Sequence, residues 1–466
     1  MTVMRMMRIH GVRLSDDDRR AIVKHLADTQ GLAPDEAREY RYILERRPPA
    51  VEHEDEEMTV MCARCHSYAQ IALQRRDEAE WRRLSHFHLG QYPSLEYHSR
   101  GRDRNWWEIA SGEIPARLAE LYPFDTDEWT EWRKNAKADL AGTWRVTGHH
   151  PGKGGYEGRA DVVRSGTDEY RIAMKIRYAG GETATGRGTA VVYTGYEWRG
   201  SLDLGGEKVR QVLAADEDGD SLSGRWFLED HDSLGADIEA VRVTAADTQV
   251  LAVEPPFLKA GSQAKVAIHG IGLSGAPALG DGIRVLGHPE GAGDTITAVI
   301  QVEPNATEGS RDVSVGEAKT EALFTVYSEI DALRVEPDFA IGRVGGGGGP
   351  IPAVPVQFEA VGYLNGADGE PGTDDDLRVG VLPADWSVTD YNEAARAMKD
   401  SEFAGEMKAG GLFVPAAAGP NRKRKFSTNN AGDLTITARA NDGGTKLEAT
   451  SHLIVSVQRW VDPPIR

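Results

Sequence analysis

Three residues near the amino terminus have the types and spacing of a haem attachment motif. Cys62, Cys65 and His66 form the pattern C-x-x-C-H, which is the sequence signature of c-type haem. On one helical turn, the two cysteines can form thioethers to the vinyl groups of one haem, and the adjacent histidine can place a ring nitrogen on the iron. The motif therefore predicts one covalent haem c, with His66 as an axial ligand.

Two other chemistries also use a C-x-x-C pair. A zinc site needs a second pair of ligands at suitable spacing, but the chain contains only two cysteines. A thioredoxin-like redox site needs a βαβ context, whereas the apolar pattern around the motif is helical. Haem attachment is the interpretation that both observations favour.

The second axial ligand is predicted to be a histidine. Many c-type cytochromes use a downstream methionine, but the next one after the motif is Met174, in a region with a strand pattern. We favour His88, which begins the loop-like run His-Leu-Gly-Gln-Tyr-Pro, with His86 and His98 as alternatives. Bis-histidine iron has a lower reduction potential than His/Met iron, because thioether ligation raises it.

The amino terminus holds a possible second ligand region. Met6, Met7 and His10 precede a helical pattern over 15–30, an arrangement typical of the back half of another small cytochrome domain. The front half, with its own C-x-x-C-H, is missing from the sequence, and no export signal is visible. We therefore expect Met1 to be an internal methionine, and the full-length protein to carry a second haem.

The predicted secondary structure that positions these residues changes from helices to strands near residue 140. Helical patterns are expected over 15–30, about 63–76, 77–90, 114–122 and 129–137. About eight alternating runs between 140 and 245 favour a small antiparallel barrel, which leaves no exposed edge. The phrase L-x-V-E-P then opens two β-rich stretches, at 251–255 and 333–337, each of a size typical of immunoglobulin-type sandwiches.

The predicted fold is multidomain, with an all-α cytochrome c-type region followed by all-β domains. The cytochrome c-type region spans 1–138, divided into a truncated first haem subdomain (1–48) and a second subdomain (49–138). The β domains are an antiparallel barrel over 139–247 and immunoglobulin-like sandwiches over 248–328 and 329–466.

The charge balance excludes some partners. Lys and Arg total 54 against 73 Asp and Glu, a formal charge of −19, which argues against binding of nucleic acid or of anionic membrane surfaces. No apolar run reaches the roughly 18–20 residues of a membrane span.

Three weaker signals have ordinary structural explanations as well as functional ones. The acid-rich turns 216–220 and 368–376 could bind Ca²⁺, but solvated turns are the favoured interpretation. The basic run Arg422–Lys425 is expected to be a solvated loop, with docking on an acidic partner as the alternative. Trp106 and Trp107 could pack on a haem edge or in a plain core.

With their flanking sequences, these features resemble the α (haem-binding) subunit of quinohaemoprotein amine dehydrogenase. The matching segments are the Cys62–His66 motif, RMMRIHGVRLSDDDRRAIVKHLADTQGLAP, and FHLGQYPSLEY followed by GRDRNWW. The order of cytochrome region, barrel and two immunoglobulin-like domains is also similar.

The resemblance implies an electron-transfer role in the periplasm. In that family a small subunit carries cysteine tryptophylquinone and oxidises primary amines, supported by a β-propeller subunit. Electrons then pass through the haem subunit to a soluble acceptor, either a blue-copper protein or a cytochrome c. The resemblance assigns the Cys62–His66 motif and, for the truncated first site, the Met4–His10 loop. We find no catalytic constellation for amine oxidation in this chain, so that site is expected on a partner.

Two rival functions belong to other classes. One is an extracellular multidomain β protein that binds a partner or serves as a scaffold, with an incidental haem. The other is a haem enzyme that acts alone, such as a peroxidase, which would need an open sixth position on the iron.

Overall fold

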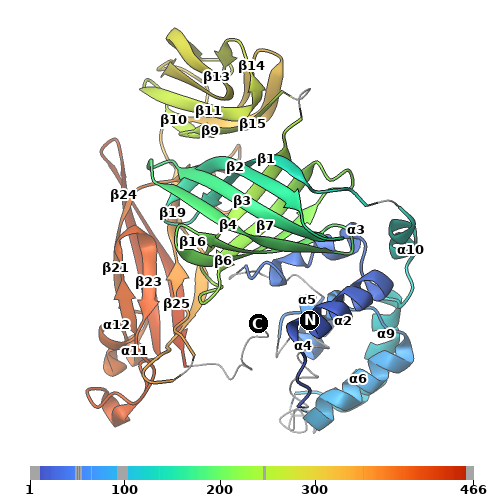
Figure 1. Ribbon diagram of the computed structural model, residues 1–466. Helices are drawn as coiled ribbons and strands as arrows, with labels where there is room; N and C mark the ends of the chain where they lie inside the picture. The colour runs from blue at the N-terminus through green and yellow to red at the C-terminus, as the bar shows by residue number, and fades with distance from the viewer. Residues whose placement is uncertain are drawn as a thin grey trace. The chain divides into compact units, whose positions relative to one another are not determined.

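The computed structural model combines helices at the amino-terminal end with strands over the remainder (Figure 1), which confirms the predicted fold class. It describes residues 11–47, 50, 52, 55–63, 66–91, 103–135, 137–244, 248–349 and 351–457. The chain divides into two compact units. The first unit comprises the described part of Met1–Asp139 with Val192–Trp198, and the second the described part of Leu140–Val191 and Arg199–Val461.

Side-chain caps begin three helices of the first unit, α2, α4 and α10. The Ser15 hydroxyl accepts the Asp18 N–H, and the Thr126 hydroxyl accepts the Trp129 N–H, so each satisfies a donor that the first turn leaves open. The bounds are α2 (Asp16–Gln30), α3 (Pro34–Arg38), η1 (Arg41–Ile43), α4 (Glu56–Cys62), α5 (Ala69–Ala72), α6 (Glu78–Gln91), α8 (Trp106–Ser111), α9 (Glu113–Leu121) and α10 (Asp127–Lys134).

One predicted helix is wrong. The pattern over 63–76 does not form a single helix, because α4 already ends at Cys62 and α5 covers only Ala69–Ala72. The Ala63 N–H closes α4 on the Thr59 carbonyl. The carboxylate of Glu52 then accepts the N–H groups of Tyr68 and Ala69, which starts the next turn separately. Local periodicity could not reveal this interruption, because Glu52 comes from an earlier part of the chain.

A buried cluster holds the helices of the first unit together. Trp81 of α6, Trp106 of α8 and Leu118 of α9 pack with Met58 and Met61 of α4 in one apolar core. The Trp106 indole N–H points at the Met61 carbonyl, at 3.4 Å, which agrees with the core role considered for this residue. The helix α4 that ends at Cys62 is thereby fixed against α6 and α9.

The second unit begins with the predicted barrel. Its strands are β1 (Gly142–His150), β2 (Gly154–Arg164), β3 (Glu169–Tyr178), β4 (Thr183–Tyr193), β5 (Glu197–Leu204), β6 (Glu207–Ala215), β7 (Ser221–Leu228) and β8 (Gly235–Arg242). They form a closed barrel in sequence order, and β1 pairs with β8 to complete it. Burial alternates along β3, as expected for a strand with one face inward. Met174 lies on this strand and is buried.

Two β domains follow the barrel. The first packs the sheet β10-β15-β14-β12 against β13-β11-β9 around a core that includes Val266, Ile268 and Phe324. Its strands are β9 (Gln249–Glu254), β10 (Phe257–Lys259), β11 (Gln263–Leu273), β12 (Pro277–Ala278), β13 (Ile283–Val302), β14 (Gly309–Val315) and β15 (Ala318–Tyr327). Both copies of L-x-V-E-P end in a cis Glu–Pro bond.

The last domain has three sheets, β16-β19-β20, β17-β25-β24-β21 and β18-β23-β22, around a core that includes Phe358, Phe413 and Ile436. Its elements are β16 (Ala332–Glu336), β17 (Phe339–Arg343), β18 (Val356–Gln357), β19 (Glu359–Leu364), β20 (Leu377–Val381), β21 (Ala384–Asp390), α11 (Glu393–Met398), α12 (Asp400–Phe403), β22 (Gly405–Met407), η2 (Ala409–Gly411), β23 (Leu412–Pro415), η3 (Lys425–Ser427), β24 (Gly432–Asp442) and β25 (Thr445–Ser456). Among the described residues, no helix has both the length and the apolar character needed to cross a membrane.

Candidate haem-binding site

The haem motif lies where α4 ends. The Asp55 carboxylate caps this helix by accepting the Met58 N–H, and the helix finishes at Cys62. His66 belongs to the irregular segment between α4 and α5. Cys65 lies outside the described residues, so only Cys62 and His66 of the motif can be placed.

The surroundings of Cys62 oppose a reactive thiolate. Burial raises the pKa of its thiol to about 12, and the nearby carboxylates of Asp55 and Glu57 add to the effect. A redox-active C-x-x-C needs the opposite, a thiol pKa lowered by positive charge or a helix amino terminus. The structure therefore disfavours the thioredoxin-like interpretation.

The structure brings His66 and His88 together. Their ring centres are 6.4 Å apart and their planes are inclined by 42°. A metal–imidazole bond of about 2.1 Å puts two rings on opposite sides of one metal with centres roughly 6 to 6.5 Å apart. The spacing of these two side chains therefore fits one iron atom between them.

Each imidazole is oriented by a hydrogen bond from its Nδ1. The His66 Nδ1 lies 2.9 Å from the Ser67 carbonyl oxygen, and the His88 Nδ1 lies 2.8 Å from that of Leu84. Since a carbonyl only accepts, each Nδ1 carries a proton, and Nε2 is the nitrogen through which a neutral ring would bind a metal. Burial lowers the pKa of His88, which favours its neutral form.

A carboxylate that the sequence interpretation missed supports the His66 segment. Glu52 accepts the hydroxyl protons of Tyr42 and Ser67 and the N–H groups of Tyr68 and Ala69, at 2.8 and 3.1 Å. Burial opposes its ionisation, but these hydrogen bonds outweigh burial and hold the pKa of Glu52 below its ordinary value. No motif could have identified Glu52, which lies among other acidic residues.

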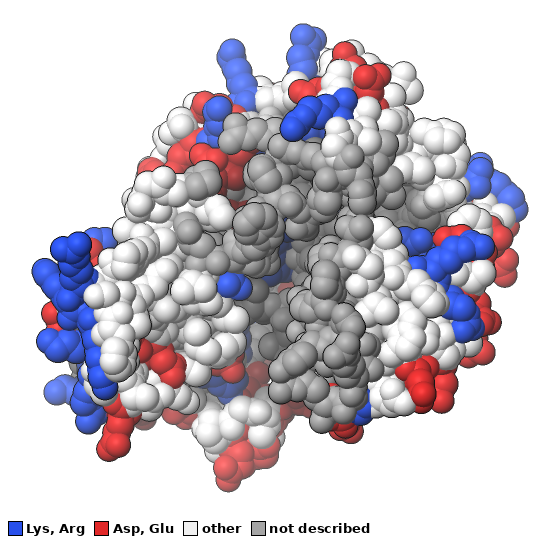
Figure 2. All heavy atoms as spheres, turned by 90° about the horizontal axis from the view of Figure 1, so that it is seen from below, with Lys and Arg blue, Asp and Glu red and all other residues white. Residues whose placement is uncertain are grey.

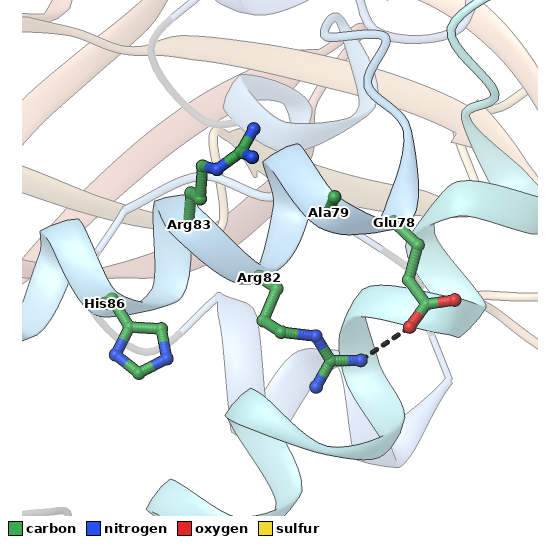
Figure 3. A pocket seen from close by; sticks show the side chains of 5 residues that line it. All are labelled: Glu78, Ala79, Arg82, Arg83 and His86. Atoms are coloured by element: carbon green, nitrogen blue, oxygen red, sulfur yellow. Dashed lines mark hydrogen bonds and ion pairs between the residues drawn. The ribbon is translucent and has the colours of Figure 1, made fainter.

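His86 occupies a different face of α6. Its ring meets Trp107 edge-on, with centres 4.8 Å apart, and it lines a surface pocket with Glu78, Ala79, Arg82 and Arg83 (Figure 3). Figure 3 also shows the ion pair of Arg82 with Glu78. The structure thus places the ring of His88 next to His66, and that of His86 against Trp107.

The other candidate ligands cannot be located. His98, Met6, Met7 and His10 lie outside the described residues. Within the part of the chain that is described, no group of three His, Cys, Asp or Glu residues is arranged to hold a metal ion. In the acid-rich turn 216–220, Asp216 accepts the N–H groups of Asp220 and Ser221, as in an ordinary turn.

Comparison with known families agrees with this geometry. Four domain models of the quinohaemoprotein amine dehydrogenase alpha subunit match the chain in succession: the haem-binding domain at residues 1–129, domain II at 137–243, domain III at 247–328 and domain IV at 333–465. The chain belongs to this family. This alpha subunit is therefore a haem-bearing subunit of an amine dehydrogenase, and its family implies further subunits.

Other comparisons add little. No curated protein matches the chain. The redesigned β barrel mFAP1, bound to DFHBI, is 20% identical and is covered over 94% of its length by 22% of this chain, with a TM-score of 0.20. The mouse clustered PcdhgC3 EC1-3 structure is 12% identical, with 51% of this chain and 76% of that chain covered and a TM-score of 0.19. Scores this low carry no argument about fold or function.

Proposed function

We propose that this alpha subunit relays electrons through a covalent haem c, from a quinone on a partner subunit to a soluble acceptor. Cys62 and Cys65 would supply the thioethers, and His66 and His88 the axial nitrogens. The observation that carries the proposal is the pair of neighbouring imidazoles, with ring centres 6.4 Å apart and each Nδ1 bonded to a backbone carbonyl.

Bound haem supplies a one-electron carrier whose potential depends on its axial ligands and surroundings. The protein's own contribution is to fix the orientation of both imidazoles, because the Nδ1 of each is bonded to a backbone carbonyl, and burial favours the neutral form of His88. If His66 and His88 both bound the iron, no position would be left open for peroxide. This favours a relay over the peroxidase alternative.

Family membership supports the remaining parts of the proposal. Amine oxidation would occur on a small subunit that carries cysteine tryptophylquinone, next to a β-propeller subunit. A blue-copper protein or a cytochrome c would accept the electrons. Covalent haem attachment and these partners indicate the periplasm, and residues Met4–His10 would serve a second haem.

The test compares His88→Ala with a matched control, His86→Ala, in the full chain expressed with c-type haem maturation. We expect the parent and the control to show six-coordinate, low-spin spectra without peroxide turnover. His88→Ala should become high-spin and bind carbon monoxide. A low-spin spectrum unchanged in His88→Ala would reject His88 as the ligand, and peroxide turnover by the parent would reject the relay.

A further inference from the structure

A basic loop of the last domain presents an aromatic side chain to solvent. Phe426 is 83% exposed, whereas Val163, the next most exposed large apolar residue among those described, reaches 54%. Lys425 places its ammonium group 5.1 Å from the centre of the Phe426 ring. Residues Arg422 to Ser427, here termed the 422–427 loop, therefore combine positive charge with an apolar tip.

A buried arginine fixes this loop. Arg424 is 5% exposed and Asp400 of α12 is 6% exposed, and the two form an ion pair. The same guanidinium donates to the carbonyl oxygens of Asn429, at 2.9 Å, and Ala431. One of the four basic residues thus serves as an anchor, and the loop is not a freely solvated charge run.

The backbone at the tip is strained. Phe426 and Ser427 have φ angles of 61° and 51°, a left-handed conformation that residues other than glycine seldom adopt. Such strain persists only where surrounding contacts impose it. Here the Arg424 anchor and the hydrogen bond from the Ser427 N–H to the Arg424 carbonyl impose it. The backbone that carries the exposed phenyl group is therefore fixed before any contact forms.

The remaining cations of the loop are uncompensated. Arg422, Lys423 and Lys425 are exposed, and none has an ion-pair partner among the residues that the structure describes. Figure 2 shows Lys and Arg side chains gathered at its left edge, the side on which Figure 1 labels α11 and α12. In a chain with a net charge of −19, this local excess of positive charge selects an acidic partner surface.

We propose that the 422–427 loop is a docking loop that inserts Phe426 into an apolar pocket rimmed by carboxylates on another subunit of the same complex. A rigid aromatic anchor loses little entropy on binding, and aromatic side chains and arginine are typical of interface centres. A protein partner is favoured over an anionic membrane because the chain as a whole would be repelled by the lipid charge. The inference rests on family membership and does not depend on haem ligation.

The experiment titrates the haem-loaded full chain into the other subunits of the complex, purified without it, and follows assembly by native mass spectrometry at low and high salt. Phe426→Asn removes the ring, and asparagine tolerates the left-handed backbone. The triple variant Arg422→Ser, Lys423→Ser and Lys425→Ser removes the charges. A matched control removes three exposed cations from the barrel, none of which has an ion-pair partner among the described residues: Arg171→Ser, Lys175→Ser and Arg187→Ser.

We expect each loop variant to weaken assembly by about tenfold or more. The triple variant should also lose most of the salt dependence of assembly. The control should assemble with the affinity of the parent. Assembly of Phe426→Asn with the parent's affinity would overturn the proposal even if the triple variant folded poorly. Binding of the parent to phosphatidylserine vesicles that Phe426→Asn abolishes, with assembly unchanged, would instead assign the loop to a membrane surface.

Discussion

The two imidazoles of the haem site are supported by different kinds of structure. His88 lies on α6, and its Nδ1–H binds the Leu84 carbonyl four residues earlier on the same helix. His66 lies in an irregular segment, and the carbonyl that it binds belongs to Ser67, the next residue. A helix fixes its own carbonyls, whereas the Ser67 segment depends on Glu52, which is distant in sequence. One side of the site is built locally and the other by tertiary contacts.

We expect the largest effect, a change in reduction potential, from replacing His88, the ligand that its own helix supports. His88→Met replaces an imidazole with a thioether, so we expect the reduction potential to rise by roughly 100 mV or more, because thioether ligation raises the potential of haem iron. Potentiometric titration measures the change, with His86→Ala as the control. A potential that does not move would show that His88 is not bound to the iron.

Removing Glu52, which supports the His66 segment from an earlier part of the chain, should have the next largest effect on the haem site. Glu52→Ala leaves the Tyr68 and Ala69 N–H groups without an acceptor, and we expect a loss of about 1–3 kcal/mol in the free energy of unfolding of the helical unit. The looser His66 should also give a partly high-spin spectrum. Chemical denaturation and visible spectra test the two effects together. A stability loss with an unchanged spectrum would confine Glu52 to a structural role.

The support of His66 by Glu52 also predicts that the stability of the helical unit depends on pH. Because the folded protein holds the pKa of Glu52 below the ordinary value of 4.5, its contribution to stability is present above that value and is lost as the pH falls through the folded pKa. Glu52→Gln should reduce this acid sensitivity. Thermal unfolding between neutral and acidic pH measures it, and parallel curves for parent and variant would contradict the prediction.

The smallest loss of stability should come from removing a single hydroxyl group. Tyr42→Phe removes one donor to Glu52 and keeps the ring, so we expect a loss of about 0.5–1.5 kcal/mol with an unchanged haem spectrum. Tyr40→Phe provides a control on a neighbouring tyrosine whose hydroxyl is hydrogen-bonded to the neutral Tyr122 hydroxyl and not to Glu52. Equal losses in the two variants would indicate that the Glu52 network is not specific.

The part of the site that is built locally could be predicted from the sequence, and the part that depends on tertiary contacts could not. The periodicity of α6 and its boundary near residue 90 could be predicted, because the apolar pattern and the helix occupy the same residues. The break between α4 and α5 could not, because Glu52 creates it from outside the segment. Helix geometry alone puts His86 and His88 on different faces of α6, but only the packing of α6 decides that His88, and not His86, lies next to His66.

The sequence by itself determined the haem chemistry and the order of domains, because the C-x-x-C-H motif, the change from helical to strand periodicity and the repeated L-x-V-E-P phrase are all local. Tertiary structure decided which groups meet. The approach of His66 to His88, the support from Glu52 and the buried ion pair of Arg424 with Asp400 each join residues separated along the chain. Contacts of that kind depend on how elements pack, and no local pattern records them.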